Sequence, residues 1–386
     1  MDESPVTSGS TSEPVAGLEG VVVAESEISH VDGTAGRLIY RGYAIEDLAE
    51  NSTFEETALL LLDGELPGED ALESFRARLA EERALEDEVL DLLHGFAADA
   101  DPMAALRTGV SAAGMFDPDA GADPSDAEAT RRQAIRLIAR LPTIVAAFDR
   151  LRRGEVPVEP RQELSHAANF LWMLAGEDPA EPAAEIVDVA LILHAEHGMN
   201  ASTFSARVTA ATLSDLHSAI TSAVGTLKGT LHGGANAEVM RMLLEIEERG
   251  MEPEAYVDEK LAARQRVMGF GHRVYETIDP RAPILADFAK RLGESTGESR
   301  WYEWSQRIRE RMEETKGLQP NVDFFSASTY YALGIPIDLF TPIFAMARVA
   351  GWAAHVEAQY ARNRLIRPRA EYVGARNRSW VPAAER

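Results

Sequence analysis

Apolar residues recur at three- and four-residue spacing through most of this sequence, and that spacing is typical of amphipathic α-helices. The clearest examples are Phe54–Leu62, Ala71–Ala80, Glu86–Phe96, Ala129–Phe148, Asn169–Leu174 and Ile186–His197. A β signal is confined to Gly20–Leu48, where the run Val21–Val23 and the pair Asp32-Gly33 predict short strands joined by a turn. The sequence therefore predicts a mainly α fold with a small β element near its N-terminus.

The chain has 386 residues, enough for one large domain or two unequal ones. Its hydrophobic share of 45% is ordinary for a globular protein, and no stretch approaches the ~20 apolar residues of a membrane span. Acidic Asp2 and Glu3 stand where a signal peptide carries positive charge, and Met1–Gly17 has the composition of a mobile tail. Cysteine is absent, which excludes disulfides and thiol chemistry. We therefore expect a cytoplasmic protein outside the membrane.

The net charge of −25 argues against nucleic acid or an anionic membrane surface as a partner. Nearly all positive charge is arginine, because the only lysines are Lys228, Lys260, Lys290 and Lys316. High intracellular salt favours such an acidic, lysine-poor surface, because screening removes the self-repulsion of like charges. A halophilic source is our hypothesis from this composition.

His232 stands out because two glycines follow it at once, and they let the backbone approach a ligand without a clashing Cβ. Asn236 suits an N-cap, and the apolar spacing from Val239 onward predicts a helix that ends before Gly250. A histidine just ahead of a helix N-terminus has a lowered pKa, which favours its neutral, hydrogen-bond-donating form. The alternative is a glycine-rich turn with an incidental histidine, since one short motif is weak evidence.

His194 and His197 are three residues apart and would share one face of a helix. Two imidazoles at this spacing can hold a metal, but no third ligand lies nearby and the pattern His-Glu-x-x-His is missing. We therefore predict no metal site. His194 is better explained as a core histidine, whereas His197 precedes Gly198 at a helix end, where a side chain can face a cleft.

A second histidine presented by glycines, His272, follows Gly269 and Gly271. Around it the sequence concentrates positive charge in an otherwise acidic chain, at Arg264, Arg266, Arg273 and Arg281. A solvated face paired with acids is the simpler explanation of these arginines. The two glycines and the turn at Asp279-Pro280 indicate instead an irregular segment that shapes a site.

Two further charged residues lie in apolar surroundings. Asp323 is flanked by Val322, Phe324 and Phe325, and poor hydration would make its carboxylate a better base. The alternative is an N-cap for a helix over Ser326–Leu333. Thr341-Pro342 predicts a helix start, and Arg348 is the only charged residue from Pro342 to Ala354. A lone buried arginine is costly unless an anion pairs with it, so we expect an anionic ligand or an acidic neighbour.

With these residues in place, the sequence resembles the citrate synthase family from about Gly20 to about Tyr372. The matching motifs are Leu-His-Gly-Gly-Ala-Asn at 231–236, Gly-Phe-Gly-His-Arg-Val-Tyr at 269–275, Asp-Pro-Arg at 279–281, Pro-Asn-Val-Asp-Phe at 320–324, and the Arg348 helix. Their order and spacing agree with the family as well as their letters do. The resemblance implies a citrate synthase-like two-domain helical fold that forms a homodimer, with the active site in the cleft between the domains. Residues 1–17 would form a flexible tail, 18–217 plus 327–386 the large domain, and 218–326 the small domain.

The resemblance also implies a reaction, in which acetyl-CoA condenses with oxaloacetate and citryl-CoA is hydrolysed to citrate and CoA. Asp323 would be the base, neutral His232 would donate to the thioester oxygen, and His272 would bond the oxaloacetate ketone and supply a proton. The carboxylates of oxaloacetate and citrate would be held by His197, Arg281, Arg348 and, across the subunit interface, Arg367. The candidates for coenzyme A phosphates are Arg264, Arg266 and Lys316. No tightly bound cofactor is implied, because acetyl-CoA and CoA are substrate and product.

Two positions depart from the family's pattern. Glu276 stands where a basic residue is usual, so a coenzyme A phosphate contact there is in doubt. Asp101 replaces a histidine that is common at its position. Two other functions stay open. A 2-methylcitrate synthase would use propionyl-CoA with the same residues, and a non-catalytic helical scaffold would be expected to have lost His232, His272 and Asp323.

The acidic composition predicts that the protein gains stability with salt. Unfolding midpoints measured from low to multimolar KCl should rise, because screening relieves the self-repulsion of a chain with net charge −25. A midpoint that does not rise over this range would contradict the halophile hypothesis.

Overall fold

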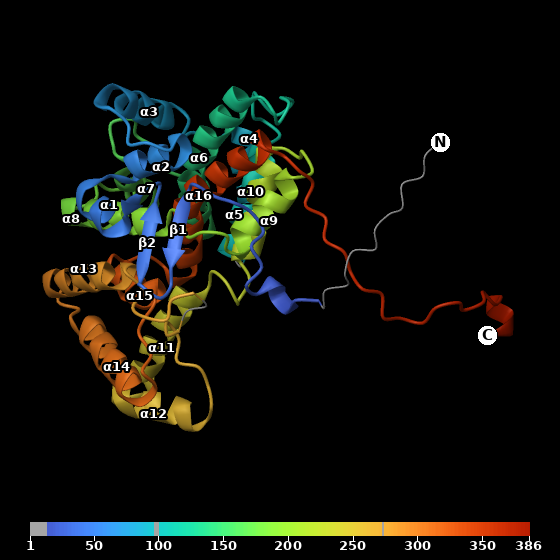
Figure 1. Ribbon diagram of the computed structural model, residues 1–386. Helices are drawn as coiled ribbons and strands as arrows, with labels where there is room; N and C mark the ends of the chain where they lie inside the picture. Colours follow the sequence, from blue (N-terminus) through green and yellow to red (C-terminus); the bar gives the residue numbers. More distant parts are fainter. Residues whose placement is uncertain (1–13, 96–99, 272–273) are drawn as a thin grey trace.

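The computed structural model describes residues 14–95, 100–271 and 274–386, and these residues fold mainly into α-helices (Figure 1). The first half contains α1 (Ile45–Asn51), α2 (Phe54–Asp63), α3 (Glu69–Glu81), α4 (Asp87–His94), α5 (Pro102–Ala113), α6 (Ala127–Arg152), α7 (His166–Ala175) and α8 (Glu181–His194). The second half contains α9 (Ala201–Ala210), α10 (Leu216–Leu227), α11 (Ala235–Arg249), α12 (Pro253–Ala262), α13 (Arg281–Thr296), α14 (Arg300–Lys316), α15 (Val322–Ala332) and α16 (Phe340–Ala361). Short 3₁₀ turns cover Ala16–Leu18, Ile337–Leu339 and Ala383–Glu385. The mainly α prediction is confirmed, and each stretch that we named from the apolar spacing contains a helix. The helix predicted to reach His197 ends at His194, and Phe96 lies outside the described residues.

The β element is a three-stranded antiparallel sheet of β1 (Ser29–Asp32), β2 (Arg37–Tyr40) and β3 (Tyr43–Ala44), in that order. The turn after Asp32 is confirmed, and the Asp32 carboxylate closes it by accepting from the Ala35 N–H at 2.9 Å. The prediction of a strand at Val21–Val23 is wrong. Val22 is 87% exposed, and no strand among the described residues pairs with Val21–Val23, so these β-branched side chains have no buried face.

Tyr40, the last residue of β2, ties this small sheet to the helical body. Its side chain is fully buried, and its hydroxyl donates to the Glu196 carbonyl at 2.7 Å and accepts from the Glu196 N–H at 3.1 Å. Backbone groups at the end of a helix need such partners when they are buried. The sheet therefore fixes the segment that follows α8.

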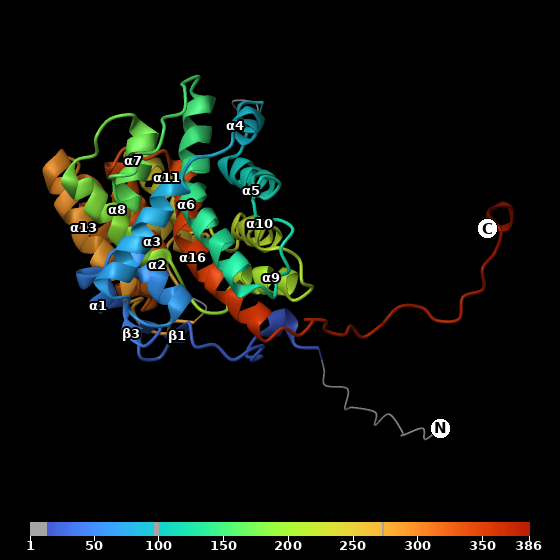
Figure 2. The same cartoon turned by 90° about the horizontal axis from the view of Figure 1, so that it is seen from above.

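Helix α16 is the central helix of the core and packs against α2, α6, α8, α9 and α10 (Figure 2). The segment Ile337–Ala361 is long and apolar enough to span a membrane, which corrects our expectation that no stretch approaches that length. In the structure 89% of the apolar 18-residue window within this segment is buried, so its side chains face other helices. Its apolar composition is that of a core helix.

Helices α11, α12, α13 and α14 gather at one end of the molecule, below the β1–β2 hairpin in Figure 1. The predicted boundaries of the small domain, 218 and 326, fall inside α10 and α15. Helix α10 packs against α5, α9 and α16, whereas α15 packs against α11, α13 and α14. We therefore propose that the division between the domains runs after α10 and after α15.

After α16 the chain leaves the helical body as an extended, exposed segment (Figures 1 and 2). It contains exposed apolar residues, among them Val373 at 90% and Trp380 at 79%. At the other end of the chain, the residues predicted as a flexible tail fall largely outside the described residues.

Candidate active site

His232 lies in the loop between α10 and α11, as expected for a residue just ahead of a helix. The glycine after it is required by packing, because a Cβ on Gly233 would lie 2.4 Å from the Leu227 carbonyl oxygen. Thr341 at the start of α16 donates its hydroxyl to the Gly233 carbonyl at 3.1 Å and so attaches the loop to the core. The expected N-cap is wrong: α11 already begins at Ala235 with Gly234 as its cap, and Asn236 is buried in the first turn.

The His232 ring also faces the N-terminus of a second helix, α9. Its Nε2 accepts from the Ser202 N–H at 3.3 Å and lies 2.8 Å from the Ser202 hydroxyl, which in turn accepts from the Trp352 indole at 3.1 Å. An Nε2 that accepts a hydrogen bond leaves the proton of a neutral imidazole on Nδ1. Burial, reinforced by the nearby charge of Arg348, lowers the pKa of His232 to about 4. The predicted neutral histidine is therefore supported, with Nδ1–H as its free donor.

Asp323 is the second residue of α15, and its flanking residues Val322, Phe324 and Phe325 are buried as expected. The alternative of an N-cap is wrong, because Asn321 caps the helix and accepts from the Asp323 N–H at 3.1 Å. Burial raises the pKa of the Asp323 carboxyl to about 7. A carboxyl that titrates near neutral pH is suited to act as a general base.

The glycine segment ahead of His272 is attached to the start of α15. The Asn321 N–H donates to the Gly269 carbonyl at 2.9 Å, and the Asn321 amide donates to the Gly271 carbonyl at 3.2 Å. Gly269 has φ of +82°, and a Cβ there would lie 2.6 Å from the Phe324 ring. The structure thus brings this segment to Asp323, as the motifs predict, while His272 and Arg273 themselves lie outside the described residues.

Two predicted carboxylate-binding arginines are buried. Arg281, at 2% exposure, forms a bidentate pair with Asp279, with distances of 2.9 Å from Nε to Oδ1 and 2.7 Å from Nη2 to Oδ2. Arg348, at 1% exposure, donates from Nε to the His194 carbonyl at 2.7 Å and lies over the Phe344 ring. No carboxylate of the described residues lies within ion-pair distance of Arg348. Glu196 is an acidic neighbour whose charge acts on Arg348 without a direct ion pair, and an anionic ligand at Arg348 stays a prediction.

His197 lies beyond the end of α8, so it does not share a helix face with His194 as expected. Its Nε2 lies 3.2 Å from the Tyr275 hydroxyl, which joins it to the glycine segment of His272. His194 is fully buried, and its Nδ1 donates to the Ala190 carbonyl at 2.7 Å, as expected for a core histidine. Among the described residues no cluster of three His, Asp or Glu side chains could hold a metal ion.

The remaining predicted residues are exposed: Arg264, Arg266, Lys316 and Arg367. Arg367 lies on the extended segment after α16 and forms no hydrogen bond or ion pair with the described residues. Asp101, whose role the sequence left unexplained, caps α5 and pairs with Lys228 at 2.8 Å. Lys228 is the C-cap of α10, so this exposed ion pair lies where the His232 loop begins.

Sequence reasoning missed three residues that support the site: Ser202, Asp279 and Tyr275. Asp279 and Tyr275 lie within the motifs at 279–281 and 269–275, but their contacts join distant segments: Asp279 accepts from the Val322 N–H at 3.2 Å, and Tyr275 contacts His197. Ser202 follows Asn200, whose side chain caps α9, so the only available signal was that of an ordinary helix start.

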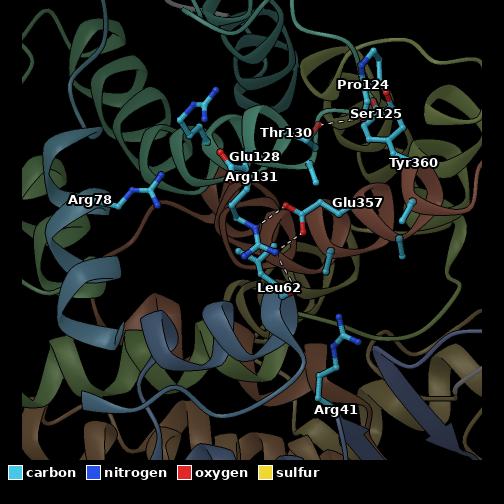
Figure 3. Close-up of a pocket in the computed structure, with 15 residues that line it drawn as sticks. Arg41, Leu62, Arg78, Pro124, Ser125, Glu128, Thr130, Arg131, Glu357 and Tyr360 are labelled. Atoms are coloured by element: carbon cyan, nitrogen blue, oxygen red, sulfur yellow. Dashed lines mark hydrogen bonds and ion pairs between the residues drawn. The ribbon is translucent and has the colours of Figure 1, made fainter. Parts of the chain in front are cut away.

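A cavity of about 730 Å³ lies elsewhere, between α16 and the start of α6 (Figure 3). Two of its arginines are already neutralised, Arg131 by a bidentate pair with Glu357 and Arg132 by Asp119. Because none of the predicted site residues lines this cavity, it is not the predicted site.

Comparison with known proteins gives a consistent result. A family model described as "Citrate synthase, C-terminal domain" matches residues 17–369. The citrate synthase of Haloferax volcanii is 55% identical over 372 residues, which cover 96% of this chain and 98% of that protein. The 2-methylcitrate synthase 1 of Corynebacterium glutamicum is 42% identical over 96% of this chain and 98% of its own length.

Solved structures agree with the sequence relatives. The crystal structure of citrate synthase from Pyrobaculum aerophilum has a TM-score of 0.90 at 39% identity and covers 99% of this chain and 100% of its own. A citrate synthase from Thermoplasma acidophilum, in a ternary complex with carboxymethyl coenzyme A and oxaloacetate, has a TM-score of 0.90 at 33% identity. It covers 97% of this chain and 100% of its own.

The raised pKa of Asp323 predicts that Asp323→Asn stabilises the protein at alkaline pH. An unfolded carboxyl titrates near 3.8 and the folded one near 7, so ionisation costs stability between these values and costs most above 7. The variant should melt about 2 °C or more above the wild type at pH 8, and the gain should vanish towards pH 4.

Asp47→Asn is the matched control, because Asp47 is also in the first turn of a helix but is exposed. It should show no such pH-dependent gain. A gain for Asp323→Asn that is equal at pH 4 and pH 8 would show that its carboxyl is not destabilised by burial.

Proposed function

The chain belongs to the citrate synthase family, and from this premise we propose how its residues condense acetyl-CoA with oxaloacetate. The enzyme is an acyltransferase, which forms citryl-CoA and hydrolyses it to citrate and CoA. The observation that carries the proposal is a histidine with a lowered pKa together with an aspartate with a raised pKa. His232 is kept neutral with a pKa of about 4, and Asp323 titrates at about 7.

The acetyl-CoA methyl group is a very weak acid, so its proton is removed only if the developing enolate is stabilised. In our proposal Asp323 takes the proton. The Nδ1–H of His232 donates to the thioester oxygen, where the negative charge develops. Because the pKa of His232 is about 4, its ring is uncharged at neutral pH and keeps the Nδ1 proton that it donates to the enolate oxygen.

Oxaloacetate carries two carboxylates, and we assign them to His197, Arg281 and Arg348. The buried guanidinium of Arg348 supports this assignment, because an anionic ligand would supply the ion-pair partner that the described residues do not. His272, outside the described residues, is assigned to the oxaloacetate ketone and to the proton it gains as the carbon–carbon bond forms. Closure of the cleft would then exclude water until citryl-CoA has formed.

Exposed basic residues are the candidates for binding the phosphates of coenzyme A. Arg264, Arg266 and Lys316 are exposed and free to meet phosphates, and Arg264 stands in a left-handed backbone conformation at φ of +55°. Glu276 is exposed too, and its N–H is bound to the Gly33 carbonyl at 2.9 Å. We therefore place the phosphates away from Glu276.

Propionyl-CoA is the alternative acyl substrate, because relatives of both kinds match this chain over nearly its whole length. The greater identity to citrate synthases favours acetyl-CoA. Steady-state kinetics with both acyl-CoAs would decide. We further propose a cytoplasmic homodimer without a tightly bound cofactor, and the Haloferax volcanii relative supports the halophile hypothesis.

The direct test is release of free thiol from acetyl-CoA with and without oxaloacetate. Wild-type protein should release thiol only when oxaloacetate is present. Asp323→Asn should fold and still bind oxaloacetate, yet lose on the order of 10²-fold or more in turnover, because the general base is gone. Turnover within a factor of a few of the wild type would remove Asp323 from the mechanism, and an inactive wild type would refute the function.

Arg367 is proposed to bind substrate in the partner subunit's site, which the extended segment after α16 would allow it to reach. Mixed dimers test this. Asp323→Asn and Arg367→Ala, each nearly inactive alone, are unfolded and refolded together. If Arg367 acts across the interface, each mixed dimer has one site with both residues intact, and activity returns.

If Arg367 acts within its own chain, every site of a mixed dimer stays defective. Tagging the two variants differently shows whether mixed dimers have formed. No recovered activity from proven mixed dimers would contradict the shared site.

A further inference from the structure

Glu196 is a fully buried acid next to a proposed substrate-binding residue, and the mechanism above gives it no role. It lies in the turn after α8, directly before His197. The exposure of its side chain is 0%, as is that of His355 on α16, and His355 Nε2 lies 3.0 Å from Glu196 Oε1. The Ser29 hydroxyl donates to the same oxygen at 2.8 Å. A buried charge with this many partners is a candidate for a specific task.

Hydrogen bonding defines the state of this pair. Arg207 can only donate, and its Nη1 lies 3.4 Å from His355 Nδ1, so Nδ1 is an acceptor. The proton of His355 is then on Nε2, from which it is donated to Glu196. Burial raises the pKa of Glu196, whereas the hydrogen bonds from His355 and Ser29 and the charge of Arg348 lower it and so favour the carboxylate.

The Glu196 carboxylate is set into the surface of α16. A Cβ on Gly351 would lie 2.3 Å from Glu196 Oε2 and 2.4 Å from the Ala195 carbonyl oxygen. Only glycine leaves room for the turn to lie this close to the helix backbone. Gly351 is therefore a specific part of the contact.

Three contacts in a row thus join the turn to one face of α16. Arg348 donates to the His194 carbonyl, Gly351 leaves room for the Ala195 carbonyl and the Glu196 side chain, and His355 donates to Glu196. Positions 348, 351 and 355 lie on one face because of the helical repeat. The turn carries His197 and the helix carries Arg348, which are two of the groups assigned to oxaloacetate.

We propose that Glu196 is a positioning residue that fixes His197 relative to Arg348, so that both reach the carboxylates of one oxaloacetate molecule. The inference rests on the proposed function. Glu196 acts through the geometry of its neighbours and does not touch the substrate. A misplacement of about 1 Å in a binding group costs up to ~10²-fold, so the effect is large enough to measure.

The experiment is steady-state kinetics on variants of the dimeric enzyme. Glu196→Ala should raise the KM for oxaloacetate about tenfold or more while kcat stays within about threefold, because binding is lost and the reacting groups are intact. Glu196→Gln keeps an acceptor for His355 and Ser29 and should restore most of the affinity. Gly351→Ala removes no hydrogen-bonding group but displaces the turn, and should raise the same KM.

Glu357→Ala is the matched control, since Glu357 is also an acid on α16 that is held in an ion pair, with Arg131 at 2.8 Å. It should lower the melting temperature and leave the KM for oxaloacetate unchanged. A purely structural role of Glu196 would make its variants resemble this control.

Wild-type KM values for oxaloacetate in both Glu196→Ala and Gly351→Ala would overturn the proposal. If Glu196→Ala does not fold, Gly351→Ala decides together with Ser29→Ala, which removes one bond to Glu196 from a partly exposed position. Failure of the proposed function would appear differently, as a wild-type enzyme without oxaloacetate-dependent thiol release.

Discussion

The structure depends on the burial of one charge, the guanidinium of Arg348 inside an apolar helix. A buried charge is unfavourable unless its neighbours stabilise it. Here the His194 carbonyl, the Phe344 ring and the negative charge of Glu196 share that task. The same low-polarity surroundings act on His232 and Asp323. Burial favours the neutral form of each, and the charge of Arg348 acts on both, so a donor imidazole and a carboxyl with a pKa near 7 lie within the field of the same buried guanidinium.

The loops of the site are held by attachments to α16 rather than by their own structure. Thr341 holds the His232 loop at Gly233, and Trp352 bonds Ser202, which bonds His232. His355 holds the turn that carries His197 through Glu196. Rigid elements that position short loops are a common basis for catalytic geometry, because a side chain on a free loop loses entropy when it binds. One core helix therefore organises residues from three separate segments.

The sequence predicted what depends on local pattern. Apolar spacing located α2, α3, α4, α6, α7, α8 and α11 but not the other helices. The glycines beside His232 and His272 marked segments that need room for the backbone. It failed where a contact between distant segments decides. The valines at Val21–Val23 have strand propensity but no strand to pair with, and Asn236 has cap propensity but lies inside a helix that starts earlier. Thr341 was expected to begin a helix, whereas α16 begins at Phe340 and the Thr341 hydroxyl serves the His232 loop. Ser202 and Glu196 carry no local signal for their long-range partners.

In the proposed mechanism Asp323, whose pKa burial has raised to about 7, removes a proton from the acetyl-CoA methyl group. The most direct measurement is exchange of the methyl protons of acetyl-CoA with deuterium from solvent, followed by NMR across pH in the presence of an unreactive dicarboxylate analogue of oxaloacetate. The exchange rate should rise with pH and level off above about 7 as Asp323 ionises. Asp323→Asn should exchange at the background rate. A rate that is independent of pH between pH 5 and 9, or unchanged in Asp323→Asn, would contradict the account.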